Sequence, residues 1–206
     1  RYTGNPILLP DPRSDWESKA VFNGCPVPMG ETLCGFVYRA VGKTGGSTIG
    51  FAEGCDALSF SHRRQFIIPE QDFEKYGCED PRVTQFEDAY YVFYTALSTY
   101  PFAPPGIRVG VAKTADFLTI TEKHLVTPFN AKAMAMFPAR IDKFVSAILT
   151  VHTDMPPAKI CFASAPHVED FWTEHFWKSW YATLDSHVIP LQKQPADQVE
   201  VGAPPI

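Results

Sequence analysis

Two adjacent carboxylates, followed by a proline and an arginine, form the densest polar cluster of the sequence, within residues 76–82 (YGCEDPR). Carboxyl groups in unequal environments can divide acid and base work, because a nearby guanidinium keeps one ionised while burial keeps another protonated. Pro81 restricts the backbone after Asp80, so we expect a turn that presents Glu79, Asp80 and Arg82 as a general-acid site. The alternative is a solvated turn with a structural Glu–Arg ion pair.

Histidine and cysteine spacing gives no sign of a metal site. The five cysteines contain no CxxC pair, and His62, His152 and His187 lie far apart in the sequence. We therefore expect no metal and no disulfide framework. Free buried thiols favour a reducing, cytoplasmic location and leave a periplasmic one open. The sequence also lacks GxGxxG, Walker and GxSxG motifs, so no cofactor is expected.

Charge and hydropathy bear on the partners of the chain. The net charge is −5, which argues against nucleic acid, because nucleic-acid binding favours a basic face. No apolar run is long enough to span a bilayer, and the first residues lack the pattern of a signal peptide, so no membrane partner is expected. A mildly acidic chain suits a neutral ligand, and a homo-oligomer is left open.

Short β-rich segments repeat along the chain and predict an all-β fold. Runs at 33–40, 89–96 and 144–152 are each followed by a second strand that ends in a similar tetrapeptide (IGFA, VGVA and ICFA). The spacing is about 50–60 residues, which is typical of propeller blades. Asp56 and Asp116 lie in the turns after the first two tetrapeptides, where we expect them to accept backbone N–H groups.

The repeats predict a single β-propeller domain over residues 1–206. About three to four blades are expected, and no closing strand is visible in the last residues, so we expect a propeller truncated at its C-terminal end. The best helical candidate is residues 168–180, and its aromatic density disfavours that assignment. Because the first strand of a blade lines the central channel, we take the three β-rich runs as inner strands, with ligand contacts at their ends.

The order of several short motifs resembles glycoside hydrolase family 130, the β-mannoside phosphorylases and mannosidases. The resemblance covers nearly the whole chain and implies a five-bladed propeller. It rests on the acidic cluster of residues 76–82 together with NPIL (5–8), WESKAVFN (16–23), YRA (38–40), FPARI (137–141) and GAPP (202–205).

This resemblance implies a carbohydrate-active enzyme that cleaves β-linked mannosides by an inverting single displacement. Asp80 matches the catalytic acid of the family, which acts through a sugar hydroxyl. Asn23 and Arg39 match residues that hold the mannosyl unit, and an amide and a guanidinium suit sugar hydroxyls. As alternatives, Asn23 is a turn residue before Gly24, and Arg39 is a surface charge that closes a strand.

The nucleophile decides between hydrolysis and phosphorolysis. Family phosphorylases carry His-Arg-Pro where this sequence has HTDMP (152–156), so an arginine that would bind phosphate is missing and Asp154 adds a repelling charge. Lys132 does match a basic position of the family. These residues favour hydrolysis slightly, and phosphorolysis by inorganic phosphate, giving mannose 1-phosphate, is the alternative.

Hydrolysis with inversion requires a second carboxylate about 6.5–9.5 Å from the acid. Glu200 is the first candidate for this base and Asp154 the second, while His152 is expected to contact substrate. Two other functions are compatible with the sequence. One is a non-catalytic glycan-binding propeller, and the other is a different five-bladed glycosidase, such as those acting on arabinans, which needs three separated channel carboxylates.

Overall fold

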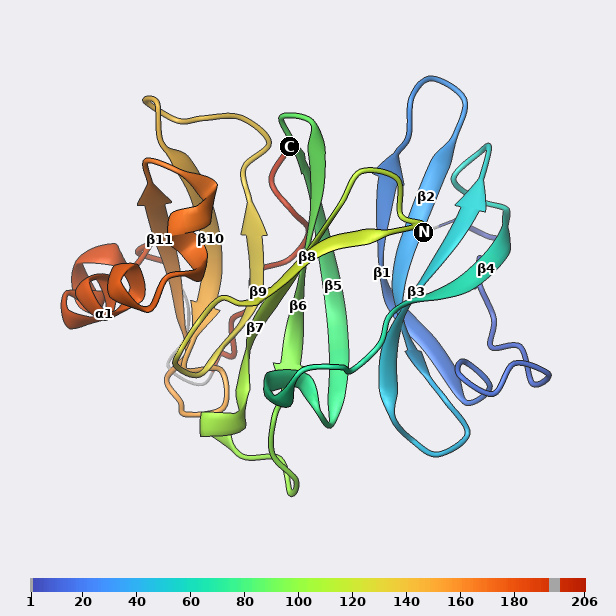
Figure 1. Ribbon diagram of the computed structural model, residues 1–206, viewed down its shortest axis with the longest axis horizontal. Coiled ribbons are helices and arrows are strands. Elements are labelled where there is room, and N and C mark those ends of the chain that lie inside the picture. Colours follow the sequence, from blue (N-terminus) through green and yellow to red (C-terminus); the bar gives the residue numbers. More distant parts are fainter. Residues whose placement is uncertain (1, 193–196) are drawn as a thin grey trace.

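Three antiparallel sheets and one α-helix make up the chain in the computed structural model, which describes residues 2–192 and 197–206 (Figure 1). The fold is therefore all-β, as predicted. The first sheet holds β1 (Ala20–Pro28), β2 (Cys34–Val41), β3 (Ser47–Gly54) and β4 (Phe60–Ile67), the second β5 (Gly77–Phe86), β6 (Ala89–Leu97), β7 (Ile107–Thr114) and β8 (Ile120–Leu125), and the third β9 (Ala131–Met136), β10 (Val145–Val151) and β11 (Lys159–Ala165).

Within each sheet the strands follow one another as hairpins, so that chain neighbours are also sheet neighbours. The predicted aspartate turns are confirmed in two of them. Asp56 accepts hydrogen bonds from the backbone N–H groups of Leu58 and Ser59, at 2.9 and 2.7 Å. Asp116 does the same between β7 and β8. These contacts replace the backbone partners that a tight turn cannot supply.

The β-rich runs found in the sequence are β2, β6 and β10, and these are the second strands of their sheets. Our assignment of these runs as inner strands was therefore wrong. The first strands β1 and β5 escaped notice because glycine, proline and polar residues interrupt their apolar alternation. Strand β9 (AKAMAM) lacks the β-branched and aromatic residues that mark a strand. β5 packs against β1 on one side and β9 on the other, so these three strands line the middle of the molecule.

Helix α1 (Glu174–Ala182) lies against the third sheet and overlaps residues 168–180, the segment whose aromatic content disfavoured a helix (Figure 1). Its first turn is capped by Thr173, whose side chain accepts from the N–H of Phe176. Trp177 and Trp180 are buried, and each indole donates to a backbone carbonyl. Packing of these large rings outweighs their modest helix propensity.

A buried carboxylate fixes the loop that leads into β5. Glu74 ends the 3₁₀ turn η1 (Asp72–Glu74) and is fully buried. It accepts from the N–H groups of Glu70 and Gln71 and from the hydroxyl of Tyr94, and it pairs with Lys123 Nζ at 2.6 Å. All of its oxygens therefore have partners, as a buried charge requires.

We expect Glu74→Ala to lower the free energy of unfolding by about 3–5 kcal/mol, because the change leaves the buried Lys123 ammonium without its main counter-charge. Urea denaturation measures the loss. Glu70→Ala is the matched control, since Glu70 pairs with the same lysine but is 64% exposed, and it should cost about 1 kcal/mol or less. Equal losses in the two variants would contradict this account.

Three of the five cysteines, Cys25, Cys78 and Cys161, are buried free thiols, Cys34 is half-buried and Cys55 is exposed. Burial raises the pKa of the Cys25, Cys78 and Cys161 thiols. In the described part of the chain, no helix is long and apolar enough to cross a membrane.

Candidate active site

The same irregularity occurs in the first strand of every sheet. One extra residue interrupts the pairing with the second strand, and the residue after the break has a left-handed backbone: Asn23 (φ 50°) in β1, Asp80 (φ 53°) in β5 and Ala133 (φ 52°) in β9. Such β-bulges re-aim a side chain relative to its strand. Because even an alanine adopts this conformation, the bulge belongs to the repeated sheet, and asparagine and aspartate tolerate it best.

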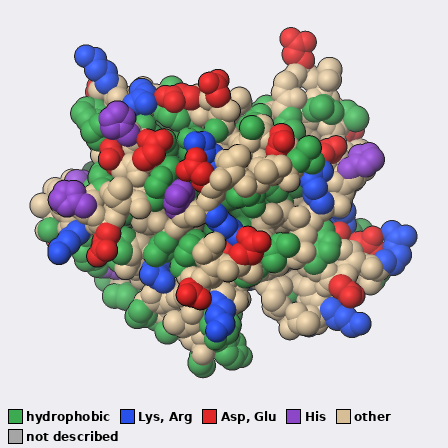
Figure 2. Space-filling model, viewed as in Figure 1, with side chains coloured by type: hydrophobic (Ala, Val, Ile, Leu, Met, Phe, Trp, Pro, Cys, Tyr) green, Lys and Arg blue, Asp and Glu red, His purple; other side chains and the backbone are tan. Residues whose placement is uncertain are grey.

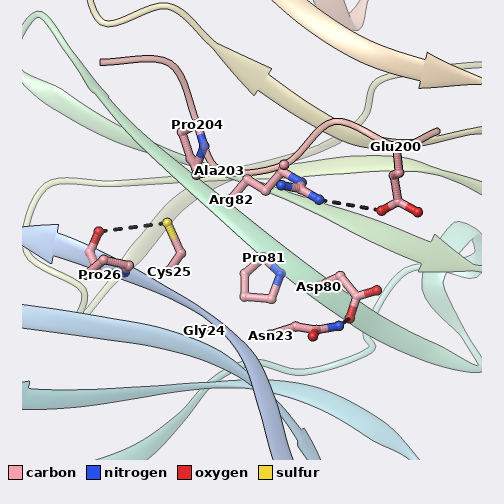
Figure 3. A pocket seen from close by; sticks show the side chains of 11 residues that line it. Asn23, Gly24, Cys25, Pro26, Asp80, Pro81, Arg82, Glu200, Ala203 and Pro204 are labelled. Carbon is pink, nitrogen blue, oxygen red and sulfur yellow. Dashed lines mark hydrogen bonds and ion pairs between the residues drawn. The ribbon is translucent and has the colours of Figure 1, made fainter. Parts of the chain in front are cut away.

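Asp80 therefore lies at a bulge within β5, and the turn we predicted for this segment was wrong. The bulge brings Asp80 to the bulge of β1. Asn23 Nδ2 donates to Asp80 Oδ1 at 2.7 Å (Figure 3). Arg39 Nη1 donates to the same oxygen at 3.3 Å. Three residues far apart in the sequence thus meet at one carboxylate oxygen.

Arg39 links the two adjacent acids. Its Nη1 contacts Asp80, and its Nη2 donates to Glu79. Ser47 accepts from Nε at 3.2 Å, and the guanidinium carbon lies 4.8 Å from the ring centre of Phe22. Burial raises the pKa of Glu79, although the charge of Arg39 opposes this shift. The two carboxylates share Arg39, and Asp80 also accepts from Asn23. A division of acid and base work between them stays a prediction.

A cavity of about 360 Å³ opens beside this cluster, and Asp80 and Glu200 both line it (Figure 3). The C-terminal segment forms one wall. Val201 donates its N–H to Thr150 at 2.9 Å and packs against Ala133, the small residue at the third bulge. A larger side chain at Ala133 would displace the segment that carries Glu200. The cavity is lined by Asn23, Gly24, Cys25, Pro26, Asp80, Pro81, Arg82, Glu200, Gly202, Ala203 and Pro204.

Arg82 Nη2 pairs with Glu200 Oε1 at 3.5 Å, and both side chains line this cavity (Figure 3). Its Nε is buried and has no hydrogen-bond partner among the described residues. Burial lowers the pKa of Arg82, but guanidinium remains charged in proteins. A buried guanidinium donor without a partner is costly, and an oxygen-rich ligand in the cavity would satisfy it.

Lys132, Asp154 and His152 are not part of the cavity lining. Lys132 Nζ pairs with Asp154 at 2.9 Å, and Asn130 holds the other carboxylate oxygen of Asp154 at 3.0 Å. The charge of Lys132, like that of Arg39, opposes the rise in the pKa of Glu79, so Lys132 lies near the acidic cluster. The residues form a second polar group, adjacent to the first.

His152 follows β10 and contacts Tyr181 of helix α1, with 2.6 Å between Nε2 and the hydroxyl. Burial lowers the pKa of His152, so its neutral form is favoured. This contact ties the loop after β10 to the helix. In the described residues, no group of histidine, cysteine, aspartate and glutamate side chains has the arrangement of a metal site.

Sequence reasoning missed Ser47 and Asn130, which hold Arg39 and Asp154 in place. Neither carries a local signal, since Ser47 is simply the first residue of β3 and Asn130 directly precedes β9. It also missed Cys25, whose buried sulfur accepts the N–H of Val83 between β1 and β5. Only the packing of neighbouring sheets reveals these contacts.

Comparison with known proteins adds to this geometry. A family model described as β-1,4-mannooligosaccharide phosphorylase matches residues 5–180. The chain belongs to glycoside hydrolase family 130. The match includes both bulged strands that meet at Asp80 and ends before the segment that carries Glu200. The resemblance drawn from the short motifs is confirmed.

Curated relatives of this family 130 chain are named as phosphorylases. A 1,2-β-oligomannan phosphorylase of Thermoanaerobacter sp. (strain X514) is 26% identical over 219 residues, covering 100% of this chain and 67% of the relative. A β-1,2-mannobiose phosphorylase of the same organism is 31% identical over 111 residues, covering 47% of this chain and 36% of the relative.

Solved structures show that the fold is shared. A β-1,2-mannobiose phosphorylase from Listeria innocua, in complex with β-1,2-mannobiose, superimposes with a TM-score of 0.70 at 20% identity, over 82% of this chain and 63% of that one. A glycosyl hydrolase from Bacteroides ovatus gives a TM-score of 0.67 at 18% identity, over 81% and 54%. The family 130 neighbours are propeller-like, and this chain shares their fold. The chain spans little more than half the length of these two structures.

Proposed function

We propose that this chain supplies the acid and the mannosyl site of an enzyme that cleaves β-1,2-linked manno-oligosaccharides by phosphorolysis. In this proposal residues 1–206 form a single domain and the three sheets are blades of a five-bladed propeller. No cofactor takes part, because inorganic phosphate is the second substrate. A cytoplasmic location, suggested by the free thiols, stays a prediction.

One observation carries the proposal: Asn23 and Arg39 both donate to Asp80 Oδ1, at 2.7 and 3.3 Å. Two donors from the neighbouring sheet hold the carboxyl in a fixed direction beside a cavity, as general acid catalysis requires. The same amide and guanidinium have further donors and acceptors for sugar hydroxyls. Asp80, which lines the cavity, is the acid in this proposal, and Glu79 holds Arg39 in place.

In the proposed reaction a phosphate oxygen forms a bond to the anomeric carbon while the bond from that carbon to the leaving oxygen breaks. The proton of Asp80 reaches the leaving oxygen, through a sugar hydroxyl as in the family. Inversion turns the β-mannoside into α-mannose 1-phosphate, and the second product is the shortened saccharide. Arg82 and Lys132 are the cations that we assign to phosphate, since both lie near the acidic cluster.

The preference for hydrolysis drawn from residues 152–156 is not supported, because the curated relatives are named as phosphorylases. That preference rested on one missing arginine and one added acid. Arg82 was not considered as a phosphate ligand, because it was expected in the general-acid site or, alternatively, in a structural ion pair. The buried Nε of Arg82 has no partner among the described residues, which supports its assignment to an anion.

Incubation of β-1,2- and β-1,4-mannobiose with and without inorganic phosphate tests this function. We expect mannose 1-phosphate from the β-1,2 substrate, and only when phosphate is present. Glu200→Gln should change phosphorolysis by less than about fivefold, because phosphate needs no carboxylate base and the contact of Arg82 with the 44% exposed Glu200 is long, at 3.5 Å. Free mannose released without phosphate, and lost in Glu200→Gln, would show hydrolysis with Glu200 as base. Binding without turnover in the wild type would point to a glycan-binding module.

A further inference from the structure

Three exposed aromatic side chains lie close together in the loops at one end of the second sheet. Tyr76 is 41% exposed, Tyr100 70% and Phe102 55%. The ring centres of Tyr76 and Tyr100 lie 6.1 Å apart, and those of Tyr100 and Phe102 lie 5.5 Å apart, with the last pair edge to face. We call these three residues the aromatic platform. Figure 2 shows hydrophobic side chains at the lower tip of the molecule, where Figure 1 places the loop between β6 and β7.

The aromatic platform lies at the same end of the sheet as the acidic cluster. Tyr76 comes directly before β5, four residues from Asp80, and extended backbone spans at most about 13 Å over that distance. Tyr100 and Phe102 lie in the loop after β6, whose last residue, Leu97, pairs with Gly77 at the start of β5. The platform therefore lies at the end of the second sheet where β5 begins, the same end that carries Glu79 and Asp80.

Ordered backbone holds these rings in place. Tyr76 donates its N–H to Leu97 at 2.8 Å, so the loop before β5 is tied to the end of β6. Ser98 closes the other loop, donating from its backbone and side chain to the carbonyl of Gly106 at 2.8 and 3.2 Å. Exposed aromatic rings on a closed loop lose little conformational freedom when they bind a ligand.

We propose that the aromatic platform binds mannosyl units that lie beyond the scissile bond in longer manno-oligosaccharides. This inference rests on the proposed function. The faces of a pyranose ring present C–H groups that pack on aromatic rings, and the tyrosine hydroxyls exchange hydrogen bonds with sugar hydroxyls. In this proposal the first two mannosyl units lie at Asp80, and the later units of a longer saccharide run along the sheet end and contact the platform. The platform thus sets a preference for chain length.

The test compares a disaccharide with a longer chain. In Tyr100→Ala, the KM for a β-1,2-mannohexaose should rise about tenfold with kcat unchanged, because the lost contact binds ground state and transition state equally. The KM for β-1,2-mannobiose should not change. Tyr100→Phe should keep most of the affinity for the hexaose. Phe144→Ala is the matched control, since Phe144 is 45% exposed and precedes β10, at the end opposite to His152.

An equal effect on both substrates in Tyr100→Ala, or none on either, overturns the platform while leaving the proposed function intact. If the wild type cleaves no mannoside, calorimetric titration with the hexaose separates the two ideas: weaker binding in Tyr100→Ala than in Phe144→Ala supports the platform, and equal binding overturns it. A dimer in the wild type that becomes a monomer in Tyr100→Ala would also overturn it, because the patch would then be a subunit interface.

Discussion

Asp80→Asn is expected to lower kcat for phosphorolysis of β-1,2-mannobiose by about 10²–10⁴-fold, the usual contribution of a general acid. The substitution preserves shape, and its amide oxygen can still accept the hydrogen bonds of Asn23 and Arg39. Substrate binding should therefore survive, with KM changed only a few-fold. Initial rates of mannose 1-phosphate release, measured over a range of substrate concentrations, separate the two parameters.

Asp88→Asn is the control for this experiment. Asp88 lies in the tip between β5 and β6, at the far end of the same hairpin, and is exposed. It should leave kcat unchanged. If Asp80→Asn kept wild-type kcat, Asp80 would not be the acid, and Glu79, whose pKa is raised by burial, would be the next residue to test.

Asp154→Asn is expected to lower the KM for inorganic phosphate by about tenfold. Asp154 forms an ion pair with Lys132 at 2.9 Å, so it competes with phosphate for this cation. It also adds a negative charge where we assign phosphate. Removing a unit charge at about 4 Å is worth roughly 1 kcal/mol in water and roughly 4 kcal/mol near a protein surface, and both side chains are about one quarter exposed. The asparagine oxygen can still accept from Asn130, so the loop should keep its position.

Removing the positive charge of Lys132 tests the same assignment of phosphate. Lys132→Met should raise the KM for phosphate, whereas the KM for mannobiose should stay within about twofold, as expected for a residue outside the cavity lining. Asp185→Asn is the matched control, because Asp185 forms a comparable lysine pair, with Lys159 at 2.6 Å, next to helix α1. An unchanged or higher KM for phosphate in Asp154→Asn would show that phosphate binds elsewhere.

Much of the fold was predictable because local chemistry dictates it. The strands β2, β6 and β10 are rich in β-branched and aromatic residues. The aspartate turns at Asp56 and Asp116 repeat after β3 and β7. Helix α1 was disfavoured because its tryptophans are neutral in propensity and its stability comes from packing against the third sheet. Inner strand β5 was hidden because it carries the site, and its polar residues break the alternation that marks a strand.

The sequence by itself determined the family and the polar residues of its motifs, because those depend on residue type and order along the chain. Tertiary structure decided which of them meet. Asn23 and Asp80 are separated by 57 residues, yet matching bulges in adjacent sheets place them 2.7 Å apart. The pairing of Lys132 with Asp154 was equally hidden, since neither position reveals its partner. Contacts between sheets depend on backbone geometry that no single segment encodes.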